Sequence, residues 1–468
     1  MEDTSIYMGE VTPSTLIDSS PLKMDTFEQQ TSTIEMKKKM ICVLGQALIN
    51  GGCPVYRVDD VLKHCTKLLG IHASYTYLPD SIMVTFIIDQ QVQTMMVKAS
   101  PSYDTSKLGR INTVMNQFLF QYHQHQYIED PDDHQHNNDH HQCDEAEDCC
   151  WELFDHCLQS LYTIIADRPT CGFFGTLFGF SISAFSGCIL LFNGSWIDAG
   201  LSGVLGALVG LLYTLSSRYP IYGRVFELSS SVVVAIIARA LHRFCCFSSV
   251  GVSAILILLP GYTMTIAVME LSARHINTGT IRLVYAVVYA FVLAYGLQVG
   301  NSMYSVIDPT SSDVGVCQDA VSPWFYIPIF PLLSISLGIT FGSSRKQWLT
   351  QTLCGAVGFL PSYFLGNVIP DGQIIGSIAS FAVGLYANLA LKITGDAPLV
   401  PLCVGVTLLV PGSIGVRGAY TLLHQEGISH DSFPIQMLTI CLAVVAGLFA
   451  ASMIVYPSGK RRSLYVSL

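Results

Sequence analysis

Two Pro-Gly pairs, each inside an apolar run, are the candidates for a binding site in this sequence. They lie in LLPGYTMTIAVMEL, which starts at Leu258, and in LLVPGSIGVRGAY, which starts at Leu408. Proline removes a helix hydrogen bond and glycine lets the chain unwind. In hydrocarbon the freed backbone groups need a cavity or a polar ligand. The pairs therefore predict a binding site for a polar solute, with a tolerated kink as the alternative; the residues concerned are Pro260, Gly261, Tyr262, Thr263, Pro411, Gly412 and Ser413.

Ionisable residues accompany both pairs. Glu227 begins an apolar run, Glu270 lies ten residues after the first proline, and Arg417 lies six residues after the second. Ionisable groups within a membrane usually face water or one another. A carboxylate that binds a proton in one state and releases it in another could couple transport to a proton gradient. The alternative for both glutamates is an interfacial charge beside Arg224 or Arg274.

The elements that must position these residues are membrane spans. Hydrophobic residues make up 51% of the 468-residue chain and charged residues only 12%, which excludes an ordinary soluble protein. From residue 171 to residue 456, apolar runs of about 17 to 22 residues follow one another, and each could cross a hydrocarbon core of about 30 Å. We count ten, centred near Phe180, Leu208, Val234, Leu258, Val288, Ile335, Gly358, Phe381, Leu408 and Val444.

Basic residues predict the orientation of these spans. If the amino terminus is cytoplasmic, ten Lys or Arg residues fall on the cytoplasmic side, and only Arg239 and Arg243 fall outside. Positive residues in short loops favour the cytoplasm. We therefore expect both termini to be cytoplasmic; the ten residues are Arg218, Arg224, Arg274, Arg282, Arg345, Lys346, Lys392, Lys460, Arg461 and Arg462.

The spans form an internal repeat. The two prolines are 151 residues apart, and GALVGLLY at Gly206 matches GAVGFLPSY at Gly355 at nearly the same offset. Each half has five spans, and because five is odd the second half enters the membrane from the opposite side. This predicts two inverted five-span repeats, the topology typical of secondary transporters with discontinuous helices.

The front of the chain predicts a soluble α+β domain. Two helical patterns, three β-branched and aromatic runs and a closing helix fit residues 37–122. Residues 123–150 hold nine acids and six histidines, which predicts a solvated linker, with metal binding as the alternative. The full division is a disordered tail 1–36, the domain 37–122, the linker 123–150, a connecting helix 151–170, the repeats 171–301 and 323–456 around a non-cytoplasmic loop 302–322, and a basic tail 457–468.

Several motifs resemble those of the threonine/serine exporter family, most closely its fungal branch of pheromone-regulated membrane proteins. In the soluble domain they are NGGCPVYRVDDVLKHCTKLLGI, LPDSIMVTF and LGRINTVMNQF; in the spans they are NGSWIDAG, LLPGYTMTIAVMEL, TGTIRL and PLVPLCVGVTLLVPGSIGVRGAY. The resemblance implies export of threonine, serine or similar small solutes, driven by a proton gradient or the membrane potential. By motif position it implies roles for Asp198, Glu270, Arg282, Pro260, Gly261, Pro411, Gly412 and Arg417.

The first functional hypothesis is a secondary transporter that exports small neutral amino acids, with the bilayer and a proton as its other partners. The second is a membrane-anchored regulatory or hydrolase-like protein whose soluble domain carries the activity. The third is a channel-like or lipid-interacting protein. The sequence predicts no catalytic residue, no metal, no cofactor and no nucleic-acid partner, and it leaves the substrate, the membrane and the oligomeric state open.

Overall fold

The computed structural model describes residues 21–88, 91–128, 142–308, 321–395, 397–409, 416 and 433–455. These residues form two compact units. The first contains the chain up to Ser102 and the segment Arg110–Asp167, and the second contains Tyr103–Gly109 and the chain from Arg168 onward. The short segment Tyr103–Gly109 is thus part of the second unit although it lies within the sequence of the first.

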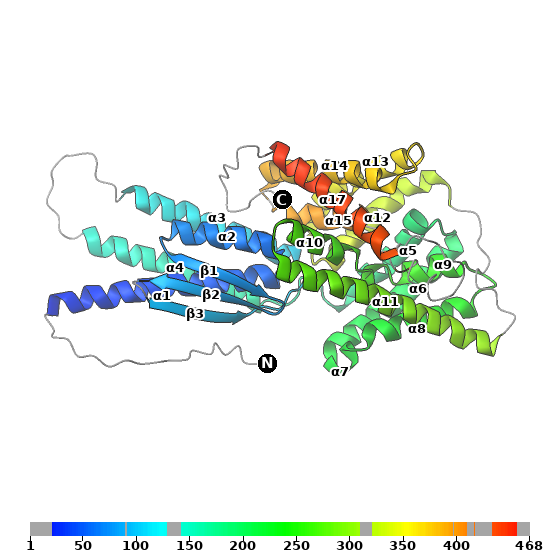
Figure 1. Cartoon of the computed structure of the whole chain (residues 1–468), viewed down its shortest axis with the longest axis horizontal. Coiled ribbons are helices and arrows are strands. Elements are labelled where there is room, and N and C mark those ends of the chain that lie inside the picture. The colour runs from blue at the N-terminus through cyan, green and yellow to red at the C-terminus, as the bar shows by residue number, and fades with distance from the viewer. Residues whose placement is uncertain are drawn as a thin grey trace. The chain divides into compact units, whose positions relative to one another are not determined.

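The first unit combines helices with one antiparallel sheet, as predicted for an α+β domain (Figure 1). The strand order is β1-β2-β3, and β2 pairs with both neighbours. Its elements are α1 (Pro21–Asn50), α2 (Val55–Leu68), β1 (His72–Leu78), β2 (Ser81–Ile88), β3 (Gln91–Lys98), α3 (Thr105–Ile128) and α4 (Gln142–Ala166), with the first residues of α3 lying in the second unit.

Alternation along β2 places the core of this unit on one face of the sheet. Ile82, Val84 and Phe86 are each at most 1% exposed, whereas Ile87 is 50% exposed. Successive side chains of a strand point to opposite faces, so one face packs against helices and the other stays open. Gly45 allows α1 to approach closely, because a Cβ there would lie 3.0 Å from the Ile82 side chain.

Helices extend into two segments for which the sequence predicts no regular structure. Helix α1 begins at Pro21, within the segment 1–36 predicted as a disordered tail. Helices α3 and α4 occupy both ends of the predicted linker 123–150, and residues 129–141 lie outside the described residues. Helix α4 packs on α1, so the predicted connecting helix belongs to the first unit.

Among its described residues the second unit consists of helices. The first half contains α5 (Phe173–Phe192), α6 (Trp196–Arg218), α7 (Pro220–Gly223), α8 (Phe226–Ala240), α9 (Phe247–Ala254), η1 (Leu256–Leu258), α10 (Gly261–Ser272) and α11 (Ile276–Ile307). The second half contains η2 (Pro323–Phe325), α12 (Tyr326–Thr340), η3 (Arg345–Gln347), α13 (Trp348–Gly366), α14 (Gly372–Thr394), α15 (Leu399–Leu409) and α17 (Phe433–Val455).

Six of these helical segments are long and apolar enough to cross a membrane. They are α5, α6, α11, η2 with α12, α14 and α17. A seventh span results if α9 and the stretch Leu256–Ser272, which bend by 60° at a short break, count as one. The lengths and compositions of these helices agree with the predicted membrane location, whereas ten spans and their inverted arrangement stay predictions.

Contacts within and between the halves follow a regular scheme. In the first half α5 packs on α6 and α8 packs on α11; in the second half α12 packs on α13 and α14 packs on α17. The halves meet where α5 contacts α12 and where α10 contacts α15 and α17. At this interface Ser183 donates to the Ser336 hydroxyl at 2.9 Å.

Glycines allow neighbouring helices to approach at backbone distance. A Cβ on Gly296 of α11 would lie 2.9 Å from the Ser231 Cβ and 3.0 Å from the Leu228 carbonyl oxygen of α8. One turn later, Gly300 contacts the α8 backbone in the same way. Small residues four apart favour close helix packing in membranes. The contact between α8 and α11 therefore depends on the absence of side chains at these two positions.

We predict that Gly296→Ala destabilises the protein by about 1–3 kcal/mol, because the added methyl group must push α11 away from α8. The unfolding free energy in detergent, measured by chemical denaturation, tests this. The matched control is Gly200→Ala in α6, where nothing lies within 4 Å of the added Cβ. Equal effects of the two substitutions would contradict the packing argument.

Candidate functional site

The first Pro-Gly pair breaks a helix inside the second unit. The carbonyl of Ile255 accepts from Leu258 N, and the backbone at Leu259 is extended before Pro260 caps α10. Regular bonding resumes when Met264 N donates to the Pro260 carbonyl at 3.0 Å. The first N–H groups of any helix lack acceptors within it and carry partial positive charge. The amino-terminal end of α10 therefore lies at the break, within the bundle.

Three aromatic rings surround this end of α10. Tyr262, the residue after Gly261, is 6% exposed, and its ring centroid lies 5.5 Å from that of Tyr103 and 5.1 Å from that of Phe341. All three pairs meet edge to face, including Tyr103 with Phe341 at 5.8 Å. This is a favoured geometry for aromatic pairs. The cluster joins the broken helix to the end of α12 and to the segment Tyr103–Gly109.

The hydroxyl of Tyr103 reaches the residues of the break. Although 41% of the residue is exposed, its hydroxyl lies close enough to the Thr263 side chain to be influenced by it. Burial raises the pKa of the Tyr103 hydroxyl, the charge of Arg282 opposes that shift, and the charge of Glu270 adds to it. Both charges are thus close enough to act on this hydroxyl. A tyrosine from outside the predicted spans therefore contributes to the predicted site.

Asp104 fixes the segment that carries this tyrosine. Its carboxylate is buried and accepts from Thr170 N at 3.0 Å, from the Thr170 hydroxyl at 2.8 Å and from Lys107 N at 3.1 Å. The next residue, Thr105, donates its N–H to the Phe341 carbonyl at 2.9 Å. Gly342, the residue after Phe341, adopts φ +67°, so the helix ends sharply here and the Phe341 carbonyl stays available for this bond. Tyr103 is thereby held on a fixed support.

Helix α10 contacts the second half through sulfur. The Tyr262 hydroxyl lies 3.2 Å from Cys403 Sγ of α15, and the Thr265 hydroxyl lies 3.8 Å from Cys441 Sγ of α17. Helix α15 ends at Leu409, immediately before the second Pro-Gly pair. The first break therefore packs on the helix that leads to the second one.

Glu270 and Arg282 form an ion pair in which the carboxylate is buried and the Arg282 side chain is 22% exposed. Glu270 is 0% exposed, and its Oε1 lies 3.4 Å from Arg282 Nη2 of α11. Arg274, the neighbour that an interfacial charge would need, is exposed. Of the two interpretations of Glu270, the structure favours a carboxylate held within the bundle. The pair joins two of the residues that the family resemblance singles out.

Asp198 has a structural position away from this site. It is 1% exposed and belongs to a capping box with Ser195 at the start of α6. Its other oxygen accepts from Cys246 N at 2.8 Å, just before α9 begins. Asp198 therefore fixes the first half of the broken helix. Glu227 lies in the first turn of α8, where its charge acts on Tyr285 and Tyr289 of α11.

The second break lies outside the described residues. Pro411, Gly412, Ser413 and Arg417 are among the residues concerned, so their predicted roles stay predictions. Around the first break the structure brings Tyr103 to Tyr262 and Thr263, and near the other end of α10 it pairs Glu270 with Arg282. Sequence reasoning missed Tyr103, Phe341 and Cys403. The only signal was the position of Tyr103 just before a helix start, because contacts between distant segments leave no local pattern.

Acidic and thiol groups of the first unit have structural partners. Asp59 accepts from the Tyr77 hydroxyl at 3.2 Å and pairs with Lys63 at 2.7 Å. Burial raises the pKa of the thiols of Cys42, Cys65 and Cys157 to about 12. A nucleophilic cysteine needs a lowered thiol pKa. These three thiols are therefore not activated for covalent catalysis.

Comparison with known proteins places the chain in a family. The model of the threonine/serine exporter family, ThrE, matches residues 39–130 and 133–304. The pheromone-regulated membrane protein 10 of Eremothecium gossypii is 24% identical over 454 residues, which are 91% of this chain and 57% of that protein. An uncharacterized protein of Schizosaccharomyces pombe is 24% identical over 461 residues, 92% of this chain and 57% of that protein.

The chain therefore spans a little over half the length of these two relatives. A shorter match, to the pheromone-regulated membrane protein 10 of Saccharomyces cerevisiae strain S288c, is 26% identical over 300 residues and covers 59% of this chain and 78% of that protein. No solved structure matches the chain.

We predict that Arg282→Met destabilises the protein by roughly 3 kcal/mol, because it removes a cation that compensates the buried Glu270 carboxylate. Denaturation in detergent measures the change, and the control is Arg274→Met, at an exposed position. Adding Glu270→Gln to Arg282→Met should restore most of the loss, since no buried charge then remains at the pair. A double variant no more stable than Arg282→Met would contradict the ion-pair argument.

Proposed function

The chain belongs to the threonine/serine exporter family, and we propose that it is a secondary transporter that exports small neutral amino acids such as threonine and serine. The observation that carries the proposal is the broken helix at Pro260, because the α10 segment that follows the break contacts the second half and carries the ion-paired Glu270 near its other end. Family membership also favours transport over a membrane-anchored enzyme.

The groups around the break match the chemistry of a hydroxy amino acid. The amino-terminal end of α10 carries partial positive charge, which suits the substrate carboxylate. The hydroxyls of Tyr103, Tyr262 and Thr263 offer hydrogen bonds to the substrate hydroxyl and ammonium groups. Glu270 lies ten residues past Pro260, roughly 15 Å along the helix, so it is not a ligand of the same substrate group. Transporters with discontinuous helices bind anionic groups at half-helix amino termini in this way.

Matching contacts in the two halves support an inverted repeat of five plus five spans. In the first half Asp198, at the start of α6, binds the backbone at the start of α9. In the second half Gln351, in the first turn of α13, donates to the Val400 carbonyl at 3.1 Å, at the start of α15. Each half thus fixes its short helix by a polar side chain from its second span. We propose that Pro411, Gly412, Ser413 and Arg417 form the counterpart of the first break.

Glu270 is the residue we propose for coupling to a proton. A carboxylate can exchange its ionic partner for a proton when the surrounding helices move, and the charge change then depends on pH. Arg282 stabilises the ionised form in the arrangement described above. Movement of α11 relative to α10 would separate the pair and favour protonation.

Both termini are proposed to be cytoplasmic. Ten basic residues fall on that side of the predicted topology, as counted above. Cys246, which this topology places outside the cytoplasm, is disulfide-bonded. Disulfides persist in oxidising compartments and are rare in the cytosol. A disulfide at Cys246 fits the orientation that the basic residues predict.

Transport of labelled threonine and serine into proteoliposomes containing the full chain tests the function. We expect uptake that exceeds protein-free liposomes and increases with an imposed pH gradient. Replacing Pro260 by Ala restores a straight helix and removes the half-helix end. The loss of about 1–2 kcal/mol of binding should reduce uptake roughly tenfold.

The matched control for this variant is Pro361→Ala, a proline inside α13 away from the break. It should retain uptake near the level of the unchanged protein. If the unchanged protein moves neither amino acid, the exporter proposal fails. If Glu270→Gln retains the full pH dependence of uptake, Glu270 is not the coupling carboxylate.

A further inference from the structure

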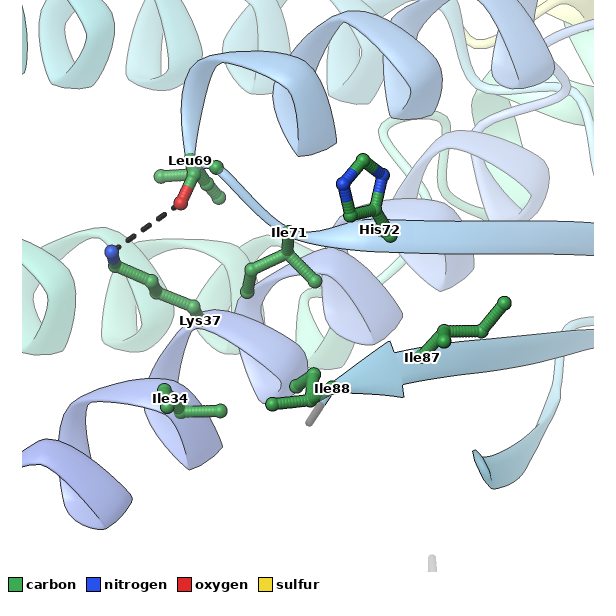
Figure 2. Close-up of a pocket in the computed structure, with 8 residues that line it drawn as sticks. Ile34, Lys37, Leu69, Ile71, His72, Ile87 and Ile88 are labelled. Carbon is green, nitrogen blue, oxygen red and sulfur yellow. Dashed lines mark hydrogen bonds between the residues drawn. The ribbon is translucent and has the colours of Figure 1, made fainter. Parts of the chain in front are cut away.

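A pocket of about 240 Å³ lies in the first unit, where α1 and the end of α2 meet the edge formed by β1 and β2 (Figure 2). Pockets for drug-sized ligands occupy about 300–1,000 Å³, so this one suits a smaller molecule. It is separate from the residues of the helix break, all of which belong to the second unit. Its lining residues are Ile34, Lys37, Leu69, Gly70, Ile71, His72, Ile87 and Ile88.

One side of this pocket is aliphatic. Figure 2 shows Ile34, Ile71 and Ile88 converging from α1, from the residue before β1 and from the end of β2. Ile87 also lines the pocket, and it is 50% exposed because it lies on the open face of the sheet. Branched apolar side chains around a small pocket favour an aliphatic group as ligand.

The other side presents a cation and a carbonyl. Lys37 Nζ donates to the Leu69 carbonyl oxygen at 3.4 Å, and Figure 2 shows the two groups facing one another across the pocket. This bond is long, because strong N–H···O bonds measure 2.7–3.2 Å. Leu69 is the C-cap of α2, so its carbonyl lies at the negative end of that helix.

We propose that this pocket binds an aliphatic α-amino acid of the size of leucine. The ligand carboxylate pairs with the Lys37 ammonium, the ligand ammonium donates to the Leu69 carbonyl, and the branched side chain packs on Ile34, Ile71 and Ile88. The Lys37 ammonium and the Leu69 carbonyl oxygen, 3.4 Å apart, complement the carboxylate and the ammonium of a zwitterion. A simple carboxylate would bind only the first of these groups, and a simple amine only the second. This site does not depend on the transport proposal.

A different role for Lys37 makes a different prediction. A lysine near the carboxy-terminal end of a helix can bind its last carbonyls and stabilise the helix without any ligand. In that case replacing Lys37 would lower stability and leave the affinity for amino acids unchanged. Affinity and stability therefore have to be measured on the same variants.

The experiment uses photoreactive leucine, a diazirine analogue, with the full chain in detergent. After irradiation, peptide mass spectrometry locates the label. We expect labelling on peptides that contain Ile34, Ile71 or Ile87, and we expect unlabelled leucine to suppress it. Lys37→Met should weaken competition by leucine roughly tenfold or more, because it removes a charge-assisted hydrogen bond.

Lys67→Met is the matched control, since Lys67 lies in the last turn of α2 but does not line the pocket. It should retain the affinity of the unchanged protein. Isovalerate and isopentylamine each carry only one of the two charges of leucine, and each should compete at least about tenfold less well than leucine. Serine carries both charges but lacks the aliphatic group, and it should also compete at least about tenfold less well.

Four outcomes would overturn the proposal: no specific label on these peptides, equal competition by isovalerate, equal competition by serine, or unchanged competition in Lys37→Met. Labelling confined to peptides of the second unit would point to the helix break instead and would also reject this site. Transport assays on Lys37→Met show separately whether the exporter function persists, so the two proposals can fail independently.

Discussion

A helix that breaks inside an apolar bundle must find new partners for its backbone, and the second unit is organised around that requirement. Carbonyl and N–H groups freed at Pro260 lie among helices rather than in water. Tyr262, directly after the break, packs its ring against two others and its hydroxyl against Cys403. The break is therefore enclosed by contacts from three separate parts of the chain, which makes it a defined feature instead of an irregularity.

Close approach of the helices makes this enclosure possible. Gly296 and Gly300 bring α11 against the backbone of α8, and Gly206 brings α6 against that of α5. With side chains at these positions, the helices that support α9 and α10 would move apart. Asp198 and Gln351 then fix the beginnings of α9 and α15. Glycines thus determine how close neighbouring helices come, and the buried polar side chains determine where the short helices α9 and α15 begin.

The segment Tyr103–Gly109 connects this bundle to residues that precede it in the sequence. Asp104 is satisfied by three donors, and Thr105 extends the contact to the end of α12. The segment therefore touches elements of both halves, α10 through Tyr103 and α12 through Phe341. In a transporter, whose halves move relative to one another, such a double contact would stabilise one arrangement over others.

The sequence by itself determined the class of the molecule, because long apolar runs and alternating strands are local properties. It predicted a soluble unit with helices and three strands, followed by apolar spans, and it predicted the break at Pro260 from two adjacent residues. The observed start of α1, end of α3 and start of α4 differ from the predicted boundaries of the tail and the linker. Polar sequences can still form helices when one face packs on a neighbour, as α4 does on α1. Periodicity in an acidic segment is too weak to reveal this.

Only the tertiary structure decided which residues share the site. The sequence left Glu270 as either a coupling carboxylate or an interfacial charge, and the packing of α10 against α11 placed it beside Arg282 in the interior. Tyr103 and Phe341 both contact Tyr262, although one precedes it and the other follows it by more than 70 residues. Spacing along the chain predicts contacts within one helix or hairpin, but contacts between distant helices depend on how they pack, which no local pattern encodes.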